Sequence, residues 1–99
     1  MSDERRQMWK FPIGCGPCET TIEMPRFACI MAVDSQRDVV CLWAEVNPDE
    51  PLTIERRFAI RATGQDFDKD LGGQYQGTCQ AADGALVWHV FETTHCDPL

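Results

Sequence analysis

The amino-acid sequence predicts an all-β fold, either a small antiparallel sandwich or a partly open barrel of about six to seven strands. Short β-branched or alternating segments recur along the chain, and few stretches of helical periodicity compete with them. Clusters of glycine, proline and aspartate separate these segments, as turns require. With 99 residues, the chain has room for one hydrophobic core. We therefore expect a single domain over residues 1–99, with an ordered core at about 8–92 and a loose tail at 93–99.

The first half of the chain contains four predicted strands. Met8–Ile13 is followed by two glycines and a proline, and Thr20–Met24 ends at a proline. Phe27–Val33 alternates, the polar segment Asp34–Asp38 forms a turn, and Val39–Val46 returns as an apolar strand, so the two strands are predicted to form a hairpin. Because both faces of Val39–Val46 are largely apolar, we expect a central strand that is covered on each side.

The second half continues the pattern after a proline-containing loop at Asn47–Pro51. Its predicted elements are a strand at Thr53–Thr63, a polar loop at Thr63–Gly73, a short strand at Tyr75–Gln80, a tight turn at Ala82–Gly84, a last strand at Leu86–Glu92 and the tail Thr93–Leu99.

The predicted core consists of large apolar residues on the later strands: Leu42, Trp43, Phe58, Ile60, Leu86, Trp88 and Val90. The six cysteines are interpreted first as small core residues, since a reducing cytoplasm keeps thiols free. Cys29 and Cys41, which lie in apolar strands, are assigned to this core.

The charge distribution excludes several classes of function. The net charge is −7, and from Ala62 onward six acids face one base, which gives −5. Without a basic stripe, direct nucleic-acid binding is disfavoured. No apolar run approaches the roughly 18 residues of a membrane span, and the first residues lack the apolar stretch of a signal peptide. We expect a cytoplasmic protein that does not bind membranes.

Cys15-Gly16-Pro17-Cys18 has the spacing of a redox pair or of half a zinc site. The following residues are β-branched and end at a proline, so no helix is expected to lower the thiol pKa, and a turn between strands is the favoured interpretation. Further zinc ligands would come from Cys79, or from His95 with Cys96, but no second pair of matching spacing exists. We predict no metal site and no cofactor, and a structural zinc on Cys15 and Cys18 stays open as an alternative.

Asp66-Phe67-Asp68-Lys69-Asp70 resembles the start of a calcium loop. The sixth position holds Leu71 instead of glycine and the twelfth holds Gly77 instead of glutamate, so a solvated acidic loop is predicted. His89 lies inside the last predicted strand with no acid or nucleophile at a recognisable spacing. We interpret it as structural, assign no catalytic residues, and predict that the protein is not an enzyme.

The candidate partner-binding residues are four acids and one aromatic residue: Asp66, Asp68, Asp70, Asp83 and Trp9. The acids lie in segments flanked by glycine, which can project them into solvent. Trp9 lies on a predicted edge strand, where a role as a core anchor and a role as an interface anchor both stay open.

The chain resembles a family of small phage- and prophage-encoded β-domains of unknown function over about residues 9–92. The stretches that carry the resemblance are Lys10–Ile13, Thr21–Pro25, Cys41–Pro48, Arg57–Ile60, Ala62–Gly64, Gly77-Thr78 and Gly84–Glu92. The chain departs from the family pattern at Cys15 and Cys18 and after Glu92. The resemblance supplies no catalytic or binding residues. It implies that the protein is encoded by a phage or prophage, whose small acidic proteins often act on host machinery.

Two functions from different classes follow. The first is a protein of a mobile element that inhibits a host defence complex, such as a CRISPR surveillance complex, by contacting a protein or ribonucleoprotein surface meant for nucleic acid. The alternative is a structural or assembly module of phage particles, which self-associates through strand edges and forms a homodimer.

Overall fold

Seven strands make up most of the computed structural model of the protein, which describes residues 5–94. Their bounds are Gln7–Gly14 (β1), Cys18–Pro25 (β2), Cys29–Gln36 (β3), Val39–Val46 (β4), Thr53–Ala62 (β5), Gln74–Ala81 (β6) and Leu86–Glu92 (β7). Two single-turn 3-10 helices, η1 (Lys69–Leu71) and η2 (Ala82–Gly84), lie on either side of β6. The all-β prediction is confirmed.

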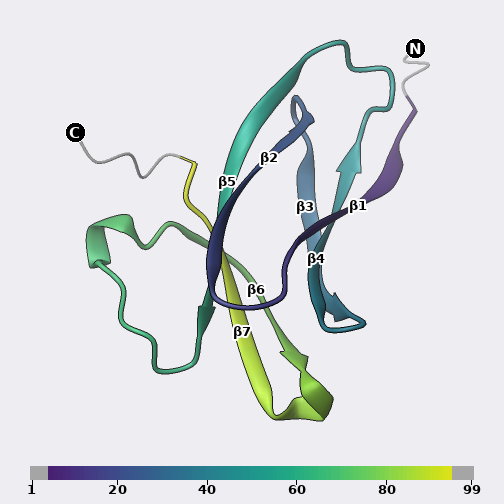
Figure 1. The fold of residues 1–99 in the computed structure, drawn as a ribbon. Helices are drawn as coiled ribbons and strands as arrows, with labels where there is room; N and C mark the ends of the chain where they lie inside the picture. The colour runs from purple at the N-terminus through teal and green to yellow at the C-terminus, as the bar shows by residue number, and fades with distance from the viewer. Residues whose placement is uncertain (1–4, 95–99) are drawn as a thin grey trace.

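The strands form two antiparallel sheets that pack as a sandwich (Figure 1). The first sheet has the order β1-β4-β3 and the second the order β2-β5-β7-β6. At one side the sheets approach each other through β3 and β6, where the Ser35 hydroxyl donates to the Gln80 carbonyl. Beside it, the Ala82 amide donates to the Asp38 carboxylate at 3.0 Å. Within residues 5–94 no strand ladder joins the sheets, so of the two predicted architectures the sandwich is the observed one.

The predicted hairpin between β3 and β4 is present, with a tighter turn than expected. Arg37 and Asp38 have φ angles of 53° and 65°, the left-handed pair that a two-residue hairpin turn requires. At the other end, β3 begins at Cys29 and not at Phe27. Phe27 has a φ of 69°, so it belongs to the turn that carries the chain from the second sheet to the first.

The core lies between the two inner sheet faces. Leu42, Phe58, Ile60, Trp88 and Val90 are buried, as predicted. On β4 the inner face is formed by alternate residues, which are fully buried: Val40, Leu42, Ala44 and Val46. Alternation along the strand therefore determines which residues of β4 enter the core.

Three predicted core positions are wrong, each because of its place in a sheet. Trp43 is only half-buried, since it pairs with Lys10 and Ala32 on the outer face of the first sheet. Cys29 is exposed on that same face. Leu86 is 44% exposed because it lies at the start of β7, beyond the stretch that pairs with β5. The prediction that β4 is covered on both sides is also wrong within residues 5–94.

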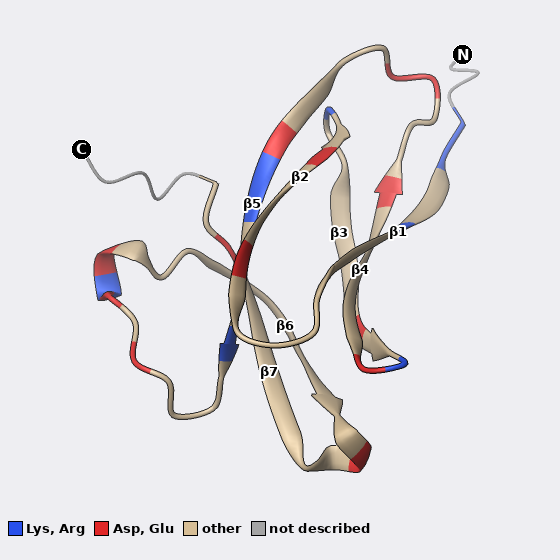
Figure 2. Cartoon of the chain, in the orientation of Figure 1, with Lys and Arg blue, Asp and Glu red and all other residues tan. Residues whose placement is uncertain are grey.

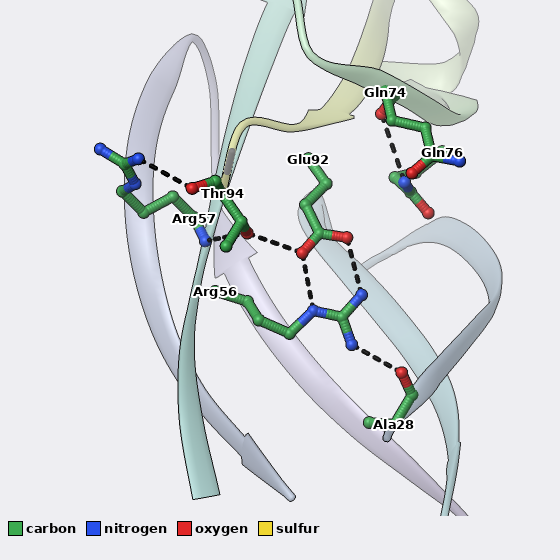
Figure 3. Close-up of polar contacts among 7 residues, drawn as sticks. All are labelled: Ala28, Arg56, Arg57, Gln74, Gln76, Glu92 and Thr94. Atoms are coloured by element: carbon green, nitrogen blue, oxygen red, sulfur yellow. Dashed lines mark hydrogen bonds and ion pairs between the residues drawn. The ribbon is translucent and has the colours of Figure 1, made fainter. Parts of the chain in front are cut away.

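A largely buried ion pair connects the turn between β2 and β3 to the second sheet (Figure 3). The Arg56 guanidinium donates twice to the Glu92 carboxylate, at 2.7 Å each, and once to the Ala28 carbonyl at 2.6 Å. The expected loose tail begins with two residues that are held against β5. The Thr93 amide donates to the Arg57 carbonyl, and the Thr94 hydroxyl accepts from the Arg57 amide. Residues 95–99 lie outside the described part of the chain.

Candidate functional site

The loop between β5 and β6 carries the predicted acidic cluster on its surface. Asp66, Asp68 and Asp70 are all exposed, with Lys69 among them. Figure 2 shows this loop projecting from one side of the sandwich, away from the turn between β6 and β7. The loop therefore presents three carboxylates within five residues to solvent, as the sequence predicted.

Arg61, at the end of β5, anchors this loop to the second sheet. Its side chain is buried, and its guanidinium donates to the Gly72 carbonyl at 2.7 Å and to the Leu71 carbonyl at 3.1 Å. The guanidinium carbon also lies 4.0 Å from the ring centroid of Phe67 and 4.8 Å from that of Phe91. Hydrogen bonds and cation–π contacts from one buried side chain thus hold both ends of the acidic segment.

Local interactions fix the path of the loop as well. The Asp68 carboxylate accepts a hydrogen bond from the Asp70 amide at 2.8 Å and so caps η1. Gly73 returns the chain to β6 with a φ of 79°, and a Cβ atom there would lie 2.4 Å from the Glu92 carbonyl oxygen. Only glycine fits this position without a shift of the backbone. The carboxylates are therefore held on a defined scaffold.

A groove of about 390 Å³ separates this loop from the start of β2. Its apolar lining includes Pro17, Phe67 and Leu71, and its charged lining includes Glu19 and Asp68. No sequence pattern associates Glu19 with the loop, because the pairing of β2 with β5 joins segments that are far apart in the chain. One signal was present: an aromatic residue, Phe67, in an otherwise polar segment.

The structure does not bring the other predicted binding residues to this loop. Asp83 lies in η2, where it lines a polar hollow of about 610 Å³ together with Asp34 and Asp38. We call Asp34, Asp38 and Asp83 the second acidic group. Asp38 and Asp83 both lie in turns, with φ angles of 65° and 56°. Asp83 is thus a neighbour of the β3–β4 turn.

Trp9 lies on β1, an edge strand of the first sheet as predicted. It is 36% exposed, its ring centroid is 6.5 Å from that of Phe11, and its indole N–H donates to Gln7. Because Trp9 pairs with the buried Ala44, it faces the inside of the sandwich at its open edge. Trp9 is therefore a partly covered core residue, and it does not belong to the acidic loop.

Cys15 and Cys18 flank the turn between β1 and β2, as predicted. Both thiols are exposed and unpaired, and desolvation, followed by the charges of Cys15 and Glu19, raises the pKa of Cys18. A raised pKa favours the protonated thiol, the opposite of what a redox nucleophile needs. Within residues 5–94, no three His, Cys, Asp or Glu side chains are grouped so that they could hold a metal ion. His95 and Cys96 lie outside the described residues.

His89 lies on the exposed face of the second sheet between two threonines. Its Nε2 is 2.7 Å from the Thr63 hydroxyl, and its Nδ1 is 3.0 Å from the Thr78 hydroxyl. Both ring nitrogens thus have neutral hydroxyl partners, and neither contacts a carboxylate. The arrangement accounts for His89 as a cross-strand polar link between β6 and β7.

Comparison with known proteins identifies a family. Residues 4–98 match the model of a family that is described as Domain of unknown function (DUF7352). No curated protein and no solved structure matches the chain. None of the helices within residues 5–94 is long and apolar enough to cross a membrane.

Proposed function

The chain belongs to the family described as Domain of unknown function (DUF7352), and from this premise we propose that it is a small phage or mobile-element protein that binds and inhibits a host defence complex. The observation that supports this proposal is the acidic loop between β5 and β6, whose three exposed carboxylates are fixed by Arg61 and η1. The proposed partner is a host protein or ribonucleoprotein, of the kind that anti-CRISPR proteins inhibit, in the host cytoplasm.

The chemistry of this function is electrostatic substitution. Carboxylates that are fixed at alternate positions take the place of phosphates in a groove that is lined by lysine and arginine. Because the loop is already anchored, little conformational entropy is lost when it binds. The proposal requires no catalytic step, cofactor or metal, and no direct contact of this domain with nucleic acid.

The experiment begins with an affinity pull-down from host cells, followed by mass spectrometry of the captured complex. Binding kinetics to the purified complex are then measured at two ionic strengths for wild type and for the variant D66K/D68N/D70N. Asparagine at position 68 keeps an acceptor oxygen for the Asp70 amide, so the cap of η1 is retained. We expect association at low salt to slow by about tenfold or more, with a flatter salt dependence.

The second acidic group supplies a matched control. The variant D34K/D38N/D83N changes the net charge by the same amount, and asparagine at position 38 keeps an acceptor for the Ala82 amide. If both folded variants slow association equally, only net charge matters and the loop is not the binding element. An unchanged rate in the loop variant would likewise remove the loop from the interface.

The outer face of the first sheet favours a second candidate function, the assembly module. Within residues 5–94 no layer covers this face, which includes the half-buried Trp43 and Met8, 52% exposed. The edge of β1 is less suited to pairing, since Lys10, Pro12 and a bulge after Pro12 are features that protect strand edges. Self-association by the face should be visible in sedimentation velocity and should be lost in Met8→Glu. A monomer at high protein concentration would exclude this function.

A further inference from the structure

The groove between the start of β2 and the acidic loop has both apolar and acidic lining residues. Phe67 and Leu71 are 49% and 38% exposed, so they offer apolar surface that the fold itself leaves uncovered. Glu19 on β2 and Asp68 on the loop bring a carboxylate from each wall. A ligand for this groove therefore needs an apolar stem and a positively charged end.

The carboxylates of the groove have no cationic partner in the described part of the chain. The Glu19 carboxylate makes no hydrogen bond or ion pair there, and the Asp68 carboxylate accepts only the bond from the Asp70 amide. The lining contains one cation, Arg61, but its guanidinium is buried and donates to two loop carbonyls. An uncharged apolar ligand would leave both acids desolvated and unpaired, which is unfavourable.

We propose that this groove receives an arginine side chain from the protein partner. The methylene stem would pack on Leu71 and Phe67, and the planar guanidinium would donate to carboxylates on both walls. Arginine fits better than lysine because its donors are spread in a plane and because it stacks on aromatic rings, as Arg61 already does on Phe67. The identity of the partner rests on the proposed function, but the chemistry of the groove does not.

The test uses a small probe, Nα-acetyl-arginine methylamide, so that it is independent of the host partner. The probe is titrated into isotopically labelled protein at low salt, and backbone amide shifts are recorded by NMR. Matched titrations use the corresponding lysine and norleucine compounds. We expect saturable shifts at Glu19, Phe67, Asp68 and Leu71, with affinity in the order arginine, lysine, norleucine.

Two charge-matched double variants locate the binding. E19Q/D68N removes both groove carboxylates and keeps the cap of η1, and it should weaken the arginine probe by about fivefold or more. D34N/D83N removes the same charge from the distant acidic group and should leave the affinity within about twofold. Equal loss in both variants, shifts that map elsewhere, equal affinity of the lysine and arginine probes, or no saturation would overturn the proposal.

The outcome separates this inference from the proposed function. If the arginine probe binds the groove but no host complex is captured, the groove assignment holds and the proposed function fails. If a host complex binds through the acidic loop and the probe does not saturate, the groove assignment fails alone.

Discussion

At the scale of single residues, burial decides how much an ion pair matters. The side chains of Arg56 and Glu92 are 14% and 12% exposed, whereas those of Arg5 and Asp49 are 59% and 65% exposed. The exposed pair is screened by water and salt. In the largely buried pair, removal of Arg56 takes away the cationic donor of the Glu92 carboxylate, which keeps a hydrogen bond from the Thr94 hydroxyl at 2.7 Å. The intact pair itself adds little net stability.

Arg56→Ala should therefore lower the free energy of unfolding by about 3 to 5 kcal/mol, because Glu92 is left buried and the Ala28 carbonyl loses its donor. Urea denaturation of the purified variant measures this change. Arg5→Ala is the control and should leave the denaturation midpoint unchanged. A wild-type midpoint for Arg56→Ala would show that the contacts of Arg56 with Glu92 and with the Ala28 carbonyl do not stabilise the fold.

The difference between an inner and an outer sheet face gives a second residue-scale prediction. Phe58 is fully buried in the core, whereas Trp43 is half-buried on the outer face. Phe58→Ala should cost about 3 to 5 kcal/mol, and Trp43→Ala clearly less. Thermal melts of both variants at low protein concentration provide the comparison. Equal losses would mean that Trp43 is covered as completely as Phe58.

At the scale of elements, the buried side chain of Arg61 holds the acidic loop between β5 and β6 in place. Arg61 belongs to β5, yet its hydrogen bonds end on Leu71 and Gly72, ten and eleven residues later. Phe67 packs on the same guanidinium and on Phe91. The loop is thus attached to the second sheet by the Arg61 side chain and not by backbone pairing.

Arg61→Leu should release the loop while the sheets stay folded, because leucine supplies no donors to the loop carbonyls. Hydrogen exchange measured by mass spectrometry should show faster exchange for residues 66–72 and unchanged protection of β4. Lys69→Met, in the same loop but without a contact to the sheet, is the control. If the exchange of the loop is unaffected in Arg61→Leu, Arg61 is not its anchor.

At the scale of the whole molecule, two layers of sheet enclose one core, and the loop that Arg61 anchors packs on part of the outer face of the second sheet. The shortest dimension is 18 Å, which suits two sheets that pack about 10 Å apart. The thiol of Cys79 lies in this core, whereas that of Cys41 lies on the other face of β4; both are buried, and desolvation raises the pKa of each. Five described cysteines are free, so the sandwich is held by packing and not by disulfides.

The raised thiol pKa values predict a loss of stability in alkaline solution. In the unfolded chain these thiols ionise near pH 9.0, while in the folded state they keep their protons to higher pH. The unfolded state therefore binds fewer protons from about pH 9 upward, and the free energy of unfolding falls until the pH passes the folded pKa. Urea midpoints at pH 7 and pH 10, with reductant present, should show a smaller fall for Cys79→Ala than for wild type.

A further prediction concerns the whole fold in the absence of metal and disulfide. Chelator and reductant together should leave the melting temperature of the wild-type protein nearly unchanged, because the core is explained by apolar packing. Calorimetry with and without both reagents tests this. Stoichiometric zinc in protein that is purified without added metal would contradict it.

The sequence by itself determined the all-β class, the β3–β4 hairpin, the bounds of β4 and β7, and the exposure of the acidic loop. These features depend on local rules: alternation along a strand, the backbone angles of turns, and the cost of burying charge.

Only the tertiary structure decided which faces are covered and which distant residues meet. Alternation divides β4 into two faces, but it does not say that the face with Trp43 lacks a covering layer. The pairing of β2 with β5 places Glu19 in the lining of the same groove as Asp68, and the approach of β3 to β6 places Asp83 in one hollow with Asp34 and Asp38. Such contacts join residues far apart in the chain, and their energy depends on the order of strands in the sheets, which no local pattern encodes.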